Sequence, residues 1–327
     1  MLITGGAGFI GSNIAARLCE DGRDVAVCDR LRAAEAGKWR NLSKHPIADF
    51  VAPEALFDWL AAHAAEVEAV VHMGAISSTT EPDADRIIHT NFGLSRDLFV
   101  WCAKHQRRLI YASSAATYGD GARGFVDDND PAALAGLRPL NAYGWSKAVF
   151  DAFAVRQAGR GRAPPQWAGL KFFNVYGPNE AHKGAMKSVA AQIWPEARDG
   201  QVVRLFKSHR EGYADGGQLR DFVYVRDVAE ITAWLLAHET VSGVFNLGSG
   251  QARSFQDMAL AVFAAAGHAP RIDYFDMPED LRAKYQYFTE ADMGRLRRAG
   301  YALPMTTLED GVADYVRGYL SQDDPYR

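Results

Sequence analysis

The sequence predicts an α/β fold, a doubly wound parallel sheet joined to a smaller, mostly helical lobe. Two patterns indicate this class. Short β-branched runs alternate with helical patterns through the first half of the chain, as a parallel sheet wound with helices requires. After Phe173 the composition shifts toward Gly, Lys, His and Arg, which interrupts the alternation. The 327 residues are enough for two packed units.

The first half is expected to alternate between strand and helix. Apolar runs predict strands at Met1–Thr4, Asp24–Cys28, Ala69–His72, Arg108–Ala112 and Leu170–Phe173. Helical spacing predicts helices at Phe9–Glu20, Pro53–Ala64, Asp83–His105 and Asn141–Gln157. In the first helix Ile10, Ile14 and Leu18 share one face, which we expect to pack against the sheet.

The second half mixes strand and helix less regularly. Phe222–Leu247 has strand–helix–strand character, and Ala185–Arg198 is a clear helix. The glycines of His209–Gly217 predict an irregular loop. The tail Ser254–Leu320 is expected to be helical, with one strand near Arg271–Phe275.

Composition narrows the class of protein. Apolar residues make up 48% and charged residues 23% of the chain, as in ordinary globular proteins. The formal charge of −4 leaves no basic field for nucleic acid. The three cysteines form no C-x-x-C pair, so we expect neither a disulfide framework nor a metal site. Met1 leads directly into a strand, and no apolar stretch reaches the ~20 residues of a membrane span, so a cytoplasmic protein without a membrane partner is expected.

A glycine-rich turn connects the first strand to the first helix. Gly5, Gly8 and Gly11 fit the roles of a dinucleotide-binding turn: a tight turn, close approach of a pyrophosphate, and close packing of helix on strand. The first-turn amides and the helix dipole would then face the phosphates. Asp29, at the end of the second strand, is placed to bind the adenosine ribose. The turn therefore predicts a Rossmann-type nucleotide domain.

The residues around the turn do not decide whether the dinucleotide is NAD or its 2′-phosphorylated form, NADP. Asp29 favours NAD, whereas Arg30 and Lys38 could face the 2′-phosphate of NADP or be solvated surface charges. We assign residues 1–176 plus about 221–249 to the dinucleotide-binding domain. Residues 177–220 plus about 250–320 are assigned to a discontinuous substrate-binding lobe.

Tyr143 and Lys147 carry the candidate chemistry. They lie about one turn apart on a predicted helix, so that both side chains project from one face. A lysine ammonium beside a phenol should lower the pKa of the phenol toward working pH. Such a tyrosine can take a proton from an alcohol while hydride leaves the same carbon. Ser114, after the strand Arg108–Ala112, is placed to hydrogen-bond the substrate oxygen.

The glycine turn, the Tyr143–Lys147 pair and Ser114 resemble motifs of the extended short-chain dehydrogenase/reductase superfamily. The resemblance covers essentially the whole chain, because further motifs match at Gly74-Ala75, Asn91, Phe173–Pro178 and Arg220–Val225. The resemblance implies a nucleotide-sugar substrate whose diphosphate is held by the second lobe. Arg220 matches the arginine used there, because a guanidinium pairs bidentately with phosphate. Structural pairing of Arg220 with Asp221 is the alternative. Homo-oligomers are common in the superfamily, so a homo-oligomer is expected.

Within the superfamily, Ala115-Ala116 stands where 4,6-dehydratases place an acidic pair, which argues against dehydration. Three other stretches, Ile76–Glu81, Ser113–Tyr118 and Asn179–Gly184, resemble the ADP-L-glycero-D-manno-heptose 6-epimerases, as do Tyr285–Thr289 and Arg297–Tyr301. Enzymes of that family invert C6″ of an ADP-heptose and are associated with NADP, which favours NADP over NAD here.

Inversion at an exocyclic carbon requires two acid/base groups. The ketone can rotate about C5″–C6″, so the keto oxygen points in two directions relative to the nicotinamide, and one group cannot reach both. The resemblance assigns Tyr143 to one orientation and Lys183 to the other, with Lys183 desolvated enough to exchange a proton near neutrality. A solvated loop lysine or a phosphate contact is the alternative for Lys183, and a structural hydrogen bond is expected for His182.

The resemblance also assigns the remaining site residues. The catalytic residues are Tyr143, Lys183, Lys147 and Ser114. The cofactor should contact Gly5, Gly8, Phe9, Ile10, Gly11, Asp29, Arg30, Lys38, Met73, Gly74, Ala75, Ile76, Ser77, Asn91, Lys147, Val175 and Lys183. The ADP-sugar should contact Ser114, Asn174, Ala185, Gln192, Phe206, Lys207, Ser208, His209, Arg220 and Tyr285.

The chain departs from the family at a few positions. Pro53 stands where the family can carry a lysine near the cofactor phosphate, which weakens the case for NADP. Ala185 and Gln192 replace a serine and a histidine near the sugar, and the loop His209–Gly217 is longer. A nucleotide-sugar 4-epimerase or reductase is therefore the second hypothesis. A non-catalytic NAD(P)-binding module is the third.

Overall fold

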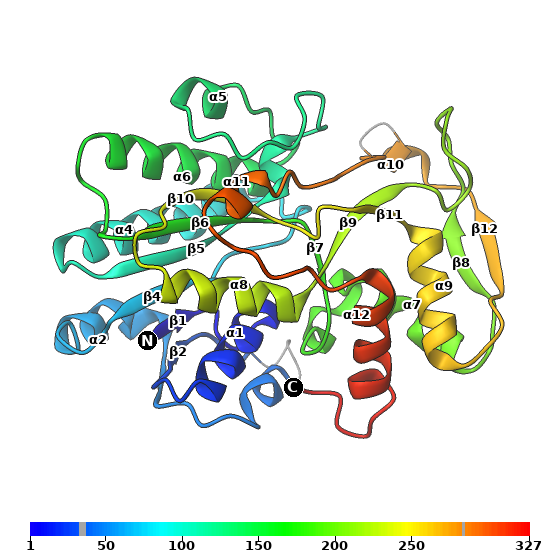
Figure 1. The fold of residues 1–327 in the computed structure, drawn as a ribbon, viewed down its shortest axis with the longest axis horizontal. Helices are drawn as coiled ribbons and strands as arrows, with labels where there is room; N and C mark the ends of the chain where they lie inside the picture. The colour runs from blue at the N-terminus through cyan, green and yellow to red at the C-terminus, as the bar shows by residue number, and fades with distance from the viewer. Residues whose placement is uncertain (33–36, 283–284) are drawn as a thin grey trace.

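The computed structural model describes residues 1–32, 37–282 and 285–327. Its centre is a seven-stranded sheet with the order β10-β6-β5-β4-β1-β2-β3 (Figure 1). Every pair of neighbouring strands is parallel. The strands are β1 (Leu2–Thr4), β2 (Ala26–Cys28), β3 (Asp49–Val51), β4 (Ala69–His72), β5 (Arg108–Ser114), β6 (Trp167–Phe172) and β10 (Gly243–Leu247). The strand order reverses between β1 and β4, which is where open α/β sheets bind ligands.

Helices cover both faces of this sheet because its strands are apolar on both sides. In β1, Ile3 packs in the core shared with α1 (Phe9–Glu20) and α8 (Val225–Ala237). Leu2, one residue away, faces the opposite core with α2 (Leu56–Ala62), α4 (Leu94–Lys104) and α6 (Ala142–Gly159). This alternation is the period of a strand, and it confirms the predicted doubly wound fold.

Two elements of the main sheet and its covering helices differ from the sequence expectation. The short edge strand β3 was not predicted, since its three residues carry little pattern. The helix predicted over Asp83–His105 is instead α3 (Ala84–Ile87), a π-helical turn (Ile88–Gly93) and α4. Such π turns are common at functional sites.

Most of the remaining elements form a smaller group toward the right of Figure 1. One small sheet has the order β11 (Ala252–Ser254), β9 (Leu219–Tyr224), β7 (Asn174–Tyr176), and another pairs β12 (Ile272–Phe275) with β8 (Val203–Phe206). The helices α7 (Val189–Arg198), α9 (Phe255–Ala266) and α12 (Leu308–Tyr315) share a core of their own. The short helices α5 (Pro131–Ala135), α10 (Glu279–Arg282) and α11 (Gly294–Arg298) complete the fold.

One part of the predicted domain division needs correction. Ala291, Met293, Leu296 and Tyr301 lie within the stretch assigned to the second lobe, yet they pack in the core of the seven-stranded sheet. The reason is that α11 returns to cover β10. The chain after residue 290 therefore returns to the main sheet before α12.

Across the described ranges, no helix combines the length and the apolar character that crossing a bilayer requires.

The turn after β1 is shaped by glycine. Gly5 has φ +65°, a backbone conformation that side chains other than glycine rarely adopt. A Cβ on Gly11 would lie 2.2 Å from the Gly5 carbonyl oxygen, so α1 can approach the turn this closely only without a side chain.

We expect Gly11→Ala to lower the free energy of unfolding by about 1–3 kcal/mol, because the backbone must shift to admit the methyl group. Gly159→Ala is the matched control: its Cβ meets open space near the end of α6, and it should be stabilising by about 0.4–1 kcal/mol. Urea denaturation measures both. Equal stability of the two variants would contradict the close packing at Gly11.

Candidate active site

A cavity of about 450 Å³ lies where the strand order reverses. The glycine turn forms one wall, the ends of β4 and β5 and the start of α6 form another, and the segment Ala181–Met186 covers it. Of the predicted site residues, it brings together Gly5, Gly8, Phe9, Ile10, Gly11, Asp29, Lys38, Met73, Gly74, Ala75, Ser77, Tyr143, Lys147 and Lys183. Ala112, Phe172, His182 and Met186 complete the lining and were not predicted as lining residues.

Asp29 closes the glycine turn from the end of β2. Its carboxylate accepts a 2.9 Å hydrogen bond from the backbone N–H of Ala7 and pairs with Lys38 Nζ at 2.9 Å. Both side chains of this ion pair are only about a tenth exposed. Arg30 instead pairs with Glu54 and is largely exposed. Lys38 is therefore built into the site, while Arg30 lies at its rim.

A second cavity of about 460 Å³ shares Gly5, Asp29 and Lys38 with the first. Three arginines, Arg30, Arg32 and Arg86, also line it. Three of the four cationic side chains in this lining pair with carboxylates, namely Lys38 with Asp29, Arg30 with Glu54 and Arg86 with Glu81, so the local excess is one positive charge, which is compatible with an anionic ligand. Predicted residues Ile76 and Ser77 lie in its wall, as does Pro53.

Asn91 holds the part of the second cavity's wall that contains Ile76. Its side chain accepts a hydrogen bond from Ile76 N at 2.8 Å and donates to Ile76 O at 3.0 Å and to Ser146 Oγ at 3.1 Å. It is buried and lines neither cavity. The π turn places Asn91 so that its side chain fixes the loop after β4.

Tyr143 enters the first cavity from the first turn of α6. Asn141 caps this helix by accepting a hydrogen bond from Gly144 N at 2.8 Å. Burial raises the pKa of Tyr143, and a hydrogen bond with Ser114 opposes this rise. Lys147 was expected to lower the pKa of Tyr143, but the structure does not bear this out, because Lys147 Nζ donates to Ala112 O at 2.7 Å.

The pKa of Lys147 itself is lowered to about 8, because burial penalises the ammonium and the charge of Asp151 only partly opposes this. Asp151 lies one helical turn further along α6 and is fully buried. The lysine can therefore change its protonation state close to neutral pH.

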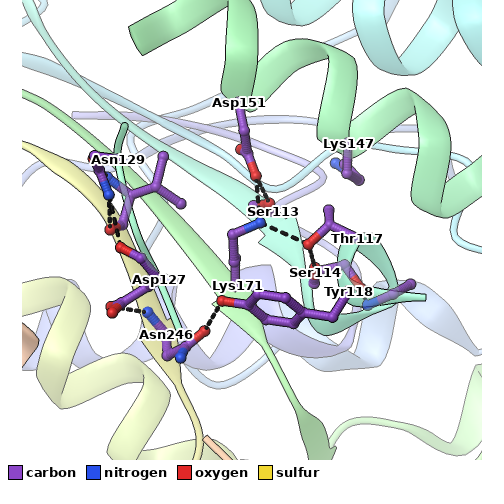
Figure 2. Close-up of polar contacts among 12 residues, drawn as sticks. Ser113, Ser114, Thr117, Tyr118, Asp127, Asn129, Lys147, Asp151, Lys171 and Asn246 are labelled. Carbon is purple, nitrogen blue, oxygen red and sulfur yellow. Dashed lines mark hydrogen bonds and ion pairs between the residues drawn. The ribbon is translucent and has the colours of Figure 1, made fainter. Parts of the chain in front are cut away.

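Asp151 is the centre of a buried polar network that joins α6 to β5 and β6 (Figure 2). It pairs with Lys171 Nζ at 2.9 Å and accepts hydrogen bonds from Ser113 Oγ at 2.7 Å and Tyr111 at 3.0 Å. Lys171 also donates to Thr117 Oγ1 at 2.6 Å, and that hydroxyl donates to Ser114 O. The network therefore holds the element bearing Tyr143 and Lys147 against the one bearing Ser114.

Lys183 lines the cavity and is half-buried, so it is not a fully solvated loop lysine. Its Nζ is 5.0 Å from the centre of the Phe9 ring, at the start of α1. Burial lowers the pKa of Lys183, and the charge of Glu180 opposes this. Tyr143 and Lys183 thus line one cavity from two different elements.

Three buried asparagines attach the Lys183 segment to the glycine turn. Asn13 on α1 donates to Pro178 O at 3.0 Å, and Asn179 donates to Ser12 Oγ at 3.0 Å. Asn41 donates to Ala7 O at 2.9 Å and to Asn179 O at 3.1 Å. Asn41 also lies 3.2 Å from His182 Nδ1, so the structural hydrogen bond expected for His182 is confirmed.

Arg220 lies on β9 and is 8% exposed. Its guanidinium lies over the rings of Tyr285 and Phe255, at 5.1 and 5.5 Å, and donates to Leu219 O. The alternative pairing with Asp221 is wrong: Asp221 accepts hydrogen bonds from backbone N–H groups of residues 249, 250 and 291. No carboxylate of the described residues pairs with Arg220, which leaves a buried cation available to an anion.

The other predicted substrate residues are more dispersed. Gln192 donates to the carbonyls of Ala185 and Lys187, so it holds the Lys183 segment from α7. Phe206 ends β8 and contacts the Tyr285 ring, and Lys207, Ser208 and His209 follow the strand. Neither Asn174, exposed on β7, nor Val175 lines the two cavities.

Comparison with known proteins gives a consistent result. Residues 1–248 match the NAD dependent epimerase/dehydratase family. The chain is 46% identical to the ADP-L-glycero-D-manno-heptose-6-epimerase of Fusobacterium nucleatum, covering 100% of this chain and 99% of that protein. It is 50% identical to the protein of that name from Nitratidesulfovibrio vulgaris, over 99% of both chains. The crystal structure of the Helicobacter pylori ADP-L-glycero-D-manno-heptose-6-epimerase aligns with a TM-score of 0.79 at 30% identity, covering 97% of this chain and 94% of that one.

We expect Lys171→Met to lower the free energy of unfolding by about 3–5 kcal/mol, because Asp151 would remain buried without its cation. Lys104→Met, at the exposed end of α4, is the control and should change stability by less than about 0.5 kcal/mol. Chemical denaturation distinguishes the two. If the two variants were equally stable, the pair would not hold α6 as described.

Proposed function

The chain belongs to the NAD dependent epimerase/dehydratase family, and from this we propose that it inverts C6″ of ADP-D-glycero-D-manno-heptose to give the L-glycero epimer. The observation that carries the proposal is the position of Lys183, half-buried in the lining of the same cavity as Tyr143. The names of the curated relatives support the substrate. We further propose NADP as the cofactor.

The residues fit a phosphorylated dinucleotide. The first residues of α1 and the glycine before it line the first cavity, and a helix N-terminus at this place suits a pyrophosphate. The cationic second cavity, with Lys38, Arg30, Arg32 and Arg86, supports a 2′-phosphate near Asp29. When bound, a nicotinamide cofactor would supply reversible hydride transfer to and from C6″.

The chain supplies the proton transfers. In one direction Tyr143, acting as its phenolate, takes the proton of the C6″ hydroxyl as hydride leaves, and Lys183, as its ammonium, gives a proton to the keto oxygen after rotation. In the reverse direction the roles exchange. Each inversion therefore leaves the two groups with exchanged protonation states, and water must reset them. Ser114 hydrogen-bonds Tyr143 and orients the phenol.

Arg220 is proposed to hold the diphosphate of the substrate. A buried guanidinium without a carboxylate partner gains most from a bidentate anion. The rings of Tyr285 and Phe255 fix its plane. This interaction anchors the nucleotide while the C5″–C6″ bond rotates.

A 4-epimerase is less well supported. Such an enzyme turns the whole sugar ring past one acid/base group and gains little from a second one in the cavity. Here a second group, Lys183, lies in the cavity, and residues 178 and 179, just before its segment, are attached to the glycine turn and α1 by buried hydrogen bonds. A non-catalytic nucleotide-binding module would not need Tyr143 and Lys147 buried at one strand end.

We expect Lys183→Met to reduce kcat for C6″ inversion by about 10²–10⁴-fold, the range of a lost general acid or base. Chromatographic separation of the two epimers measures the rate. Lys187→Met, on the same segment but outside the cavity lining, is the control. Turnover of the Lys183 variant within about tenfold of wild type would contradict the two-group mechanism.

We expect Arg220→Gln to raise KM for the ADP-sugar by roughly 10–100-fold, the effect of losing charged hydrogen bonds of about 1.5–3 kcal/mol. NADP affinity should change little, because Arg220 lines neither cofactor cavity. Arg204→Gln, at an exposed position on β8, is the control. An equal loss of NADP affinity would show that Arg220 acts through the fold instead.

A further inference from the structure

Glu180 is a buried carboxylate next to the Lys183 segment, and the mechanism above does not use it. It is 1% exposed and precedes the turn Ala181–Met186. We propose that Glu180 is the positioning residue of Lys183: its carboxylate closes the turn that carries Lys183, and its charge sets the proton affinity of the Lys183 amine. This inference rests on the proposed acid/base role of Lys183.

The contacts of Glu180 close the turn at both ends. Its carboxylate accepts hydrogen bonds from Ser188 N at 2.6 Å and Ser188 Oγ at 2.5 Å. Its backbone carbonyl accepts one from Lys183 N at 3.0 Å. Because residues 180 and 188 flank the segment, these bonds fix the path of the chain between them.

A third hydrogen bond ties this closure to the second lobe. Tyr315 on α12 donates to Glu180 Oε1 at 3.0 Å. All the donors that the structure gives this carboxylate are therefore neutral. No arginine or lysine of the described residues forms an ion pair with Glu180, so its negative charge is not neutralised locally.

Lys183 is the cation on which this charge acts. Burial raises the pKa of Glu180, and the charge of Lys183 is the first effect that opposes the rise. Burial likewise lowers the pKa of Lys183, and Glu180 opposes that shift. Two charges in a poorly solvated region interact more strongly than in water. The Phe9 ring, 5.0 Å from Nζ, adds a face that also favours the ammonium.

Other ionisable groups face Lys183 across the cavity and enter any titration of it. They come from the glycine-turn side, from α6 and from its own segment, and they are Asp29, Lys38, Tyr143, Lys147 and His182. All of them stay unchanged in a Glu180 variant. A change in the titration of Lys183 on altering Glu180 therefore reports on that carboxylate.

The consequence for catalysis is that Lys183 can exist both as the neutral amine and as the ammonium. Burial alone favours the neutral amine, which can take a proton but has none to give. The Glu180 charge keeps part of the population as ammonium, so that Lys183 can serve as the acid in one direction and as the base in the other.

The test is a titration of the full chain labelled with ¹³C-lysine, with the Lys183 Cε signal assigned through Lys183→Arg. Glu180→Gln keeps the size of the side chain and removes its charge. We expect the Lys183 titration midpoint to move to lower pH, with the corresponding limb of the kcat–pH profile moving in the same direction. At neutral pH, kcat should fall by about tenfold with KM little changed.

Tyr315→Phe is the matched control, since it removes one hydrogen bond from Glu180 and leaves the charge in place. Its Lys183 midpoint should stay where it is in the wild type. An unchanged midpoint in Glu180→Gln, or an equal shift in Tyr315→Phe, would overturn the proposal.

A wild-type measurement covers the case in which Glu180→Gln does not fold. With ¹³C-glutamate, the carboxyl carbon of Glu180 should show an inflection at the pH where Lys183 titrates, as coupled groups do. A flat signal at that pH would overturn the proposal. Full activity of Lys183→Met would instead refute the proposed acid/base role of Lys183, while the coupling between Glu180 and Lys183 stays measurable in the wild type.

Discussion

The candidate site depends on the hydrogen bonds that attach the segment after β7 to the glycine turn. Asn13, Asn41 and Asn179 are all buried, and each bonds across between α1 or its turn and residues 178–179. Without these bonds Lys183 would sit on an independent loop. With them, it is held over Phe9, beside the glycine turn that we propose as the pyrophosphate site. The same hydrogen bonds therefore fix the position of Lys183 relative to the proposed cofactor site.

Two of the three lysines that line the first cavity, Lys147 and Lys183, have the same arrangement of charges around them. Burial lowers the pKa of both Lys147 and Lys183. In each case a buried carboxylate on the same segment, Asp151 or Glu180, opposes the shift. Desolvation makes an amine available near neutral pH, and the carboxylate keeps the ammonium accessible. An enzyme that must run proton transfer in both directions requires both states.

Periodicity predicted the main strands and helices because a parallel sheet buries long apolar runs. It missed β3, whose three residues form a short edge strand. The pairing of Arg220 with Asp221 fails for a reason visible in the sequence, since neighbours on a strand point to opposite faces. The ion pair of Lys171 with Asp151 was not predictable, because a lysine within an apolar strand reveals no partner on a distant helix.

The central claim is that Tyr143 and Lys183 meet the C6″ oxygen from two sides, and crystal structures of a Tyr143→Phe variant with NADP and each epimer test it most directly. The account predicts that the C6″ hydroxyl of one epimer lies about 3 Å from Lys183 Nζ, within hydrogen-bond reach. The hydroxyl of the other epimer should point toward residue 143. Both hydroxyls directed at the same residue, or an ammonium of Lys183 turned into solvent, would contradict it.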